Sequence, residues 1–365
     1  MVVATAPHHA ARLDLATACL ASGEIEGAGA KLSEVFAAGT YTASITIRLR
    51  DLAALLGSEP YRGARSAVDL RAHFRGDRPS RLSPTTYGAL MTTRPTPDPS
   101  VTDRGLLTTK AYGTGEHLAA RQSLYRWQTP RHDLPGIVVN ELADVRGAVA
   151  DVGCGNGKFV TRVRGERPDL RVLPMDVSPG ILGAVPGAVV ADVQQLPVAD
   201  GVLGAVLALH MLYHVQDQAL AVRELGRVLA PGGIAVVSTN SRTDKRELEQ
   251  LWRRAAGDVL GIEKGPARVQ LSARFTLEDA PAILGQVFGD LRTIPLPGVI
   301  EVTEAEPVVA HLASYEAWAD KEGVPFRETI ERARERVDEV IETEGSFRIT
   351  CLGGILVCRG PKGAS

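Results

Sequence analysis

The stretch Gly147–Val160, GAVADVGCGNGKFV, decides the fold of this chain. Its first half is apolar and rich in β-branched residues, which predicts a buried strand. A turn with a glycine at every second position follows, and the start of a helix comes directly after it. Glycine-rich turns between a strand and a helix bind several kinds of ligand, because the bare backbone can approach the ligand closely.

Two common ligands fit this turn poorly. The glycines stand at Gly153, Gly155 and Gly157, whereas the dinucleotide fingerprint G-x-G-x-x-G would need another glycine where Lys158 stands. A phosphate-binding loop, G-x-x-x-x-G-K-[ST], needs a serine or threonine to bind magnesium, and Phe159 occupies that place. A packing turn without any ligand remains the alternative at this point.

Three carboxylates stand at the ends of consecutive predicted strands. Asp151 lies at the end of the first predicted strand, Asp176 at the end of the second, and Asp192 at the end of the third. The carboxyl ends of the strands are where an open α/β sheet binds its ligands. Acidic residues there would repel a polyphosphate, and they suit a cationic ligand that carries a ribose and an amine. Asp151 has a second interpretation, as the cap of the following helix.

The segments from residue 106 onward alternate between strand and helix. Continuous apolar strands separated by helical spacers predict a doubly wound, mostly parallel α/β sheet with helices on both faces. We expect the last strand to be an antiparallel edge of that sheet. The expected strands are 148–153, 171–178, 187–193, 201–212, 232–240, 291–300 and 345–360, with a helical block at about 303–343.

The composition of the chain limits its possible partners and its cellular location. The 365 residues carry a net charge of −2, which gives no global attraction to nucleic acid or acidic lipid. Four scattered cysteines and no apolar segment of membrane-spanning length favour a cytoplasmic protein without disulfides or a membrane anchor. We expect a small, mainly helical N-terminal unit over residues 1–75, a linker or crossover over 76–105, and the main domain over 106–365.

Five motifs in order, VADVGCGNG, MDVS, ADVQQLP, LALHMLYHVQD and RELGRVLAPGGIAVVS, resemble those of class I S-adenosylmethionine-dependent methyltransferases. The similarity spans about residues 110–360 and is strongest to the branch of ubiquinone and menaquinone biosynthesis. It implies the seven-stranded Rossmann-like methyltransferase fold, a helical lid over 303–343, and S-adenosylmethionine as cofactor. The cofactor contacts that it implies are Asp151, Gly153, Cys154, Gly155, Asn156, Gly157, Asp176, Val177, Asp192, Val193, His210 and Arg121.

Methyl transfer from a sulfonium needs the acceptor held in line with the breaking bond, and a base only where the acceptor must lose a proton. The candidates are His210, Tyr213 and His214, each of which has simple packing as its alternative. The helical entry segment and the lid offer further walls for a pocket, namely Tyr112, His117, Gln122, Tyr125, Trp127, His311, Tyr315 and Trp318. No metal-ligand spacing is visible.

The leading hypothesis is therefore an enzyme that methylates a small molecule, such as a secondary metabolite. An RNA methyltransferase is the alternative, because eight arginines lie between Tyr41 and Leu82. A regulator that reads DNA through the segment LRDLAALLG is the third. For the N-terminal unit, formation of a homodimer, covering of the acceptor pocket and binding of a partner all stay open.

Overall fold

The computed structural model describes residues 98–321 and 323–361, together with Ala16, Ala28 and Leu32. Contacts divide the chain into two compact units, Met1–Arg94 and Pro95–Ser365, and the second unit is described below. The helical unit expected over 1–75, and the arginine-rich segment within it, lie outside the described residues apart from those three positions. Function is therefore argued from the second unit.

A single sheet runs through this unit in the strand order β1-β7-β8-β6-β5-β2-β3-β4. The strands from β6 to β4 pair in parallel, and β6, β8, β7 and β1 pair antiparallel. The predicted doubly wound, mostly parallel α/β sheet is thus confirmed, with one short strand more than the seven expected. Its strands are β1 Gln128–Thr129, β2 Ala148–Val152, β3 Arg171–Asp176, β4 Val189–Val190, β5 Leu203–Leu209, β6 Leu229–Asn240, β7 Phe288–Val302 and β8 Phe347–Pro361.

Helices fill the connections between the strands. Local signals fix several of their ends: the Asp217 side chain accepts a hydrogen bond from the Leu220 N–H at the start of α10, and α14 ends at Gly345 in the left-handed conformation. The α-helices are α6 Arg104–Leu106, α7 Glu116–Ser123, α8 Leu134–Glu141, α9 Lys158–Glu166, α10 Gln218–Arg227, α11 Arg246–Leu260, α12 Ala280–Leu284, α13 Glu306–Ala313 and α14 Phe326–Glu344. Single-turn segments are η1 Pro99–Thr102, η2 Leu107–Ala111, η3 Leu124–Trp127, η4 Ile181–Ala184, η5 Leu212–His214, η6 Leu271–Arg274 and η7 Glu316–Lys321.

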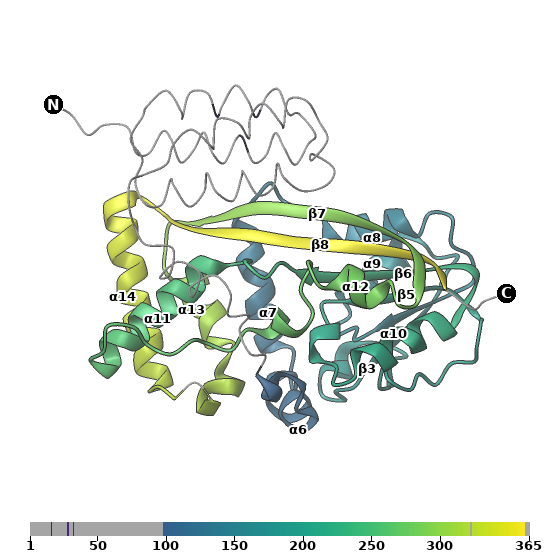
Figure 1. The fold of residues 1–365 in the computed structure, drawn as a ribbon, viewed down its shortest axis with the longest axis horizontal. Coiled ribbons are helices and arrows are strands. Elements are labelled where there is room, and N and C mark those ends of the chain that lie inside the picture. The colour runs from purple at the N-terminus through teal and green to yellow at the C-terminus, as the bar shows by residue number, and fades with distance from the viewer. Residues whose placement is uncertain (1–15, 17–27, 29–31, 33–97, 322, 362–365) are drawn as a thin grey trace, which may run out of the picture. The chain divides into compact units, whose positions relative to one another are not determined.

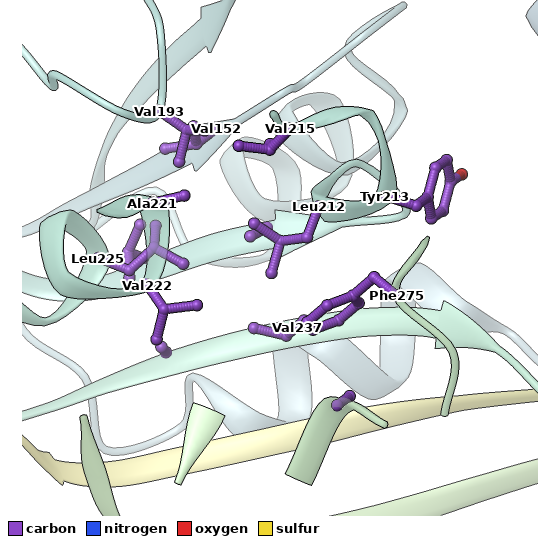
Figure 2. Packing of buried hydrophobic residues seen from close by; sticks show 14 of the residues in the cluster. Val152, Val193, Leu212, Tyr213, Val215, Ala221, Val222, Leu225, Val237 and Phe275 are labelled. Atoms are coloured by element: carbon purple, nitrogen blue, oxygen red, sulfur yellow. The ribbon is translucent and has the colours of Figure 1, made fainter. Parts of the chain in front are cut away.

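Both faces of the sheet are buried, and successive residues of each central strand point to opposite faces. In β5, for example, Val206 packs with α10 and α12, whereas Leu207 packs with α8 and α9. Figure 2 shows the first of these layers, where Val222 and Leu225 of α10 face Val237 of β6. This two-sided burial explains why the strands read as continuous apolar runs instead of alternating with polar residues.

The long strands β7 and β8 extend beyond the central sheet and carry a third core. Their outer halves pack against α11, α13 and α14, the helices that gather at one end of the unit in Figure 1. The amphipathic face predicted for α14 is present, with Ile330 and Val337 buried and Ile341 partly buried. The helical block expected at 303–343 thus corresponds to α13, η7 and α14. We call α11, α13 and α14 the lid helices.

One topological expectation was wrong. The last strand is antiparallel, but it is not an edge, because β8 pairs with β6 on one side and with β7 on the other. The edges are the two-residue strands β1 and β4, and Val189 and Val190 of β4 are about half exposed. Ile355, Leu356, Val357 and Cys358 of β8 are all buried, because core side chains cover both faces of the sheet there.

Candidate functional site

A cavity of about 840 Å³ lies at the carboxyl ends of β2, β3, β5 and β6. Its walls also come from the segment before β2, from α13 and from the loops that precede α11 and η6, so it is enclosed by residues far apart in the sequence. Carboxyl ends of parallel strands are the usual place for a ligand in an open α/β sheet. The cavity is large enough for two drug-sized groups placed side by side.

The glycine turn forms one wall, and its geometry explains its composition. Gly153, Gly155 and Gly157 all have positive φ, at +71°, +54° and +75°, a region that residues with a side chain rarely adopt. A Cβ atom on Gly153 would lie 2.8 Å from the Cβ and Cγ atoms of Met211. The Gly153 and Cys154 N–H groups donate to the Met175 carbonyl oxygen and tie the turn to β3. Cys154 and Asn156 also line the cavity.

Asp151 lies beneath this turn and is not itself part of the cavity wall. It is 1% exposed, and neither carboxylate oxygen has a hydrogen-bond partner. Burial raises the pKa of Asp151 to about 7, and the charge of Asp176 contributes in the same direction. An unpaired buried carboxylate of this kind is stabilised by a cation placed above the turn.

Asp176 ends β3 as predicted, and its side chain borders the cavity with Val177. Its Oδ2 atom accepts from the Gly155 N–H at 2.9 Å, and its Oδ1 atom accepts from the Ser178 N–H at 2.9 Å. These two bonds fix the plane of the carboxylate, and each oxygen keeps a further lone pair. The arrangement suits two neighbouring hydroxyl groups, as on a ribose.

Asp192 and Val193 also line the cavity, two and three residues beyond the end of β4. The Asp192 Oδ2 atom lies 3.3 Å from Arg104 Nη1, and its Oδ1 atom accepts from the Gln194 N–H at 2.9 Å. Arg104 also lines the cavity, so its contact with Asp192 links the segment before β2 to the turn after β4.

His210 and His214, the two histidines after β5, have different surroundings. The Val101 carbonyl oxygen can only accept, so the His214 Nδ1–H group donates to it at 2.9 Å, and Nε2 accepts from the Tyr112 hydroxyl at 2.7 Å. Burial lowers the pKa of His214 to about 4, which keeps the ring neutral. With both nitrogens occupied, His214 positions Tyr112.

His210 borders the cavity with a φ of +55°, a conformation that costs energy for a residue with a side chain. Burial, with a contribution from the charge of Lys245, lowers the pKa of His210 to about 4. The ring is therefore neutral near pH 7 and able to accept a proton. Tyr213 is buried at the cavity wall, and burial raises its pKa well above the ordinary value, so its hydroxyl stays protonated.

The segment before β2 contributes part of its predicted wall. Tyr112, Arg121, Gln122 and Tyr125 line the cavity, whereas His117 and Trp127 do not. Arg121 is 8% exposed, and its Nη1 atom donates to the Ser314 carbonyl oxygen at 2.9 Å. His311 of α13 and Tyr315, which lies just after α13, reach the cavity, but Trp318 packs in the core.

The residues of the cavity wall that sequence reasoning missed include Asp244, Lys245 and Arg268. Lys245 is 5% exposed, and its Nζ atom lies 2.6 Å from Asp244 Oδ2 and 2.7 Å from the Tyr125 hydroxyl oxygen. The polar run that follows the apolar strand β6 was the signal that could have identified the first two. Nothing in the sequence around Arg268 marks it.

Within 98–321 and 323–361 no group of three or more histidine, cysteine or carboxylate side chains could hold a metal ion. No helix in that part of the chain is both long and apolar enough to cross a membrane.

Comparison with known proteins points to one family. Residues 150–237 match the model of the methyltransferase domain family. Malonyl-[acyl-carrier protein] O-methyltransferase of Hahella chejuensis is 32% identical over 117 residues, which are 30% of this chain and 42% of that protein. An uncharacterized methyltransferase of Mycobacterium tuberculosis is 33% identical over 138 residues, 35% of this chain and 53% of that protein. The chain thus spans about half the length of the curated relatives that it matches.

Among solved structures, the YcgJ protein of Bacillus subtilis is 16% identical, with a TM-score of 0.41 over 63% of this chain and 98% of that one. The family match falls on the segment that holds the glycine turn, Asp176, Asp192 and His210. The sheet, the glycine turn and the family match agree that residues 150–237 belong to a methyltransferase domain.

Proposed function

We propose that this chain transfers the methyl group of S-adenosylmethionine to a small organic acceptor of the kind made in secondary metabolism. The observation that carries the proposal is the continuity of one cavity, about 840 Å³, from the glycine turn and Asp176 to the lid helices. One end has the features of a nucleoside site, and the rest leaves room for a second molecule.

The residues present fit the donor. Asp176 offers two oriented oxygens for the ribose hydroxyls, and Asp192 with Val193 borders the place next to it for the adenine. Asp151 is a buried carboxylate with no hydrogen-bond partner beneath the turn, and the amino group of the donor supplies the cation that compensates it. Gly153 and Gly155 line the cavity, and their positive φ angles set the shape of the turn along which the methionine portion lies.

When bound, S-adenosylmethionine supplies a methyl group on a sulfonium, a good leaving group. The chain's own task is to hold the acceptor in line with the carbon–sulfur bond and to exclude water. The electron pair of the acceptor forms the new bond to carbon, and the pair of the broken bond stays on sulfur. Where the acceptor carries a proton, we propose that the neutral ring of His210 receives it, while Tyr213 donates a hydrogen bond.

The donor site is tested by calorimetric titration of S-adenosylmethionine into the wild-type chain and an Asp176→Ala variant. Loss of the two hydrogen bonds from the ribose to a charged acceptor, at roughly 1.5–3 kcal/mol each, weakens the affinity by at least about a hundredfold. Asp290→Ala is the matched control, because Asp290 is an exposed carboxylate on β7 that does not line the cavity. Equal affinities for the wild type and Asp176→Ala contradict the proposed donor site.

The acceptor class is tested with isotopically labelled donor, offered in parallel with small-molecule extracts and with total RNA. The mass of the labelled product identifies the methylated compound. Label found only in RNA contradicts a small-molecule acceptor.

A further inference from the structure

Three buried cations line the cavity on the side of the lid helices. Arg121 comes from α7, Lys245 from the turn between β6 and α11, and Arg268 from the loop before η6. Their exposed fractions are 8%, 5% and 6%. We call these three residues the cationic cluster, because their contacts place them around the same space.

Shared aromatic neighbours bring the cluster together. The guanidinium carbons of Arg121 and Arg268 lie 5.7 Å and 4.8 Å from the centre of the Tyr315 ring. The Lys245 Nζ atom lies 4.6 Å from the centre of the Tyr125 ring, and Tyr125 is one helical turn beyond Arg121. Favourable contacts with ring faces are worth most where water is excluded, and they hold the cations in place without neutralising them.

Carboxylates compensate this charge only in part. Asp244 pairs with Lys245, and Glu249 Oε2 lies 3.8 Å from Arg268 Nε while both Glu249 oxygens also serve Arg253 and Gln270. Among the described residues no carboxylate pairs with Arg121: its Nη1 atom donates to a backbone oxygen, and its Nη2 atom is buried with no hydrogen-bond partner. A charge buried without an ionic partner is unfavourable, so the cluster is suited to an anion that enters with the ligand.

Planar geometry narrows the choice of anion. A guanidinium presents its N–H groups as a rigid fork that matches the two oxygens of a carboxylate. With Nη1 held by the Ser314 carbonyl oxygen, Nη2 remains for the ligand. The neighbouring His311 lies among the three cations, and burial together with their charges lowers its pKa well below the ordinary value, so the ring adds a neutral donor and no further charge.

We propose that the methyl acceptor carries a carboxylate, which is bound by the cationic cluster of Arg121, Lys245 and Arg268. This inference rests on the proposed function, because it concerns the second ligand of the same cavity. The donor has a carboxylate of its own, on its methionine portion, and Arg121 was expected to reach it. The experiment must therefore separate the anion of the acceptor from the anion of the donor.

The probes are benzoate and its uncharged isostere benzamide, titrated at constant ionic strength into the chain saturated with S-adenosylhomocysteine. That ligand carries the same amino-carboxylate as the donor, and it occupies the donor site throughout. We expect benzoate to bind and benzamide to bind at least tenfold more weakly. Equal binding of the two probes, or no binding of benzoate, overturns the proposal, and neither result depends on a variant that has to fold.

Variants then assign the residues. Arg121→Gln and Arg268→Gln are each expected to weaken benzoate at least tenfold while the affinity for S-adenosylhomocysteine changes less than twofold. Arg254→Gln, at an exposed arginine of α11, is the control that leaves both affinities unchanged. Weaker S-adenosylhomocysteine with unchanged benzoate shows that the cluster serves the donor, which overturns the proposal. If S-adenosylhomocysteine does not bind the wild-type chain at all, the proposed function itself has failed.

Discussion

Replacing Asp151 with asparagine is expected to stabilise the ligand-free chain at neutral and alkaline pH. Asp151 is buried, neither carboxylate oxygen has a hydrogen-bond partner, and its pKa is raised to about 7 from an ordinary value of 3.8. The unfolded chain therefore loses this proton near pH 4 and the folded chain near pH 7. Between these values the free energy of unfolding falls as the pH rises, and above them the full penalty applies.

The magnitude follows from the shift. A difference of about 3 pKa units at roughly 1.4 kcal/mol per unit gives a penalty of about 4 kcal/mol at pH 8, which is an upper bound. Because part of the penalty is already present at pH 5, the advantage of the asparagine variant over the wild type should widen by about 3 kcal/mol between pH 5 and pH 8. An asparagine side chain has nearly the same shape and does not ionise.

Denaturant unfolding of both proteins at pH 5 and pH 8, without donor, measures the difference between their free energies of unfolding. The titration of groups common to both proteins cancels in this difference. Saturation with S-adenosylhomocysteine at pH 8 should stabilise the wild type more than the variant, because the ligand's ammonium group compensates Asp151. An Asp290→Asn control, at an exposed carboxylate, should show no change of the difference with pH. A difference that stays constant from pH 5 to pH 8, or a wild type that is the more stable protein at pH 8, refutes the reasoning.

Three further substitutions test other parts of the structure. Gly153→Ala introduces both a strained φ and a contact at 2.8 Å, so it should abolish donor binding detectable by calorimetry. Gly147→Ala is the control, because its φ is +82° and no atom lies within 4 Å of the added Cβ, so donor binding should be kept. Equal donor affinities of the two variants contradict the steric argument. Tyr112→Phe leaves the buried Nε2 atom of His214 without its donor and should lower the free energy of unfolding by about 1–3 kcal/mol, and no loss in a denaturant titration speaks against that bond. Two arginines of α14 lower the pKa of Asp258 to about 2. Asp258→Asn should therefore lower the free energy of unfolding by about 1 kcal/mol at pH 7 and by progressively less as the pH falls below 4. A loss of stability that does not depend on pH excludes the ion pair as its cause.

Much of the proposed donor site could be predicted from local sequence. The alternating glycines predict a turn that only glycine can form, because the sign of φ is a property of single residues. The apolar runs around them predict parallel strands, and Asp176 at the end of one such run reaches the cavity for the same reason. Periodicity likewise predicts the buried face of α14, at Ile330 and Val337.

The sequence by itself therefore determined the fold class, the ligand-binding edge of the sheet and the positions of the glycine turn, since each depends on residues close together in the chain. Only the tertiary structure decided that β8 lies inside the sheet, that the buried carboxylate of Asp151 has no hydrogen-bond partner, and that His214 holds Tyr112. It alone brought Arg121 to a carbonyl 193 residues away and placed Lys245 and Arg268 around the same space. Packing between distant segments sets such contacts, and no local pattern of side chains encodes them.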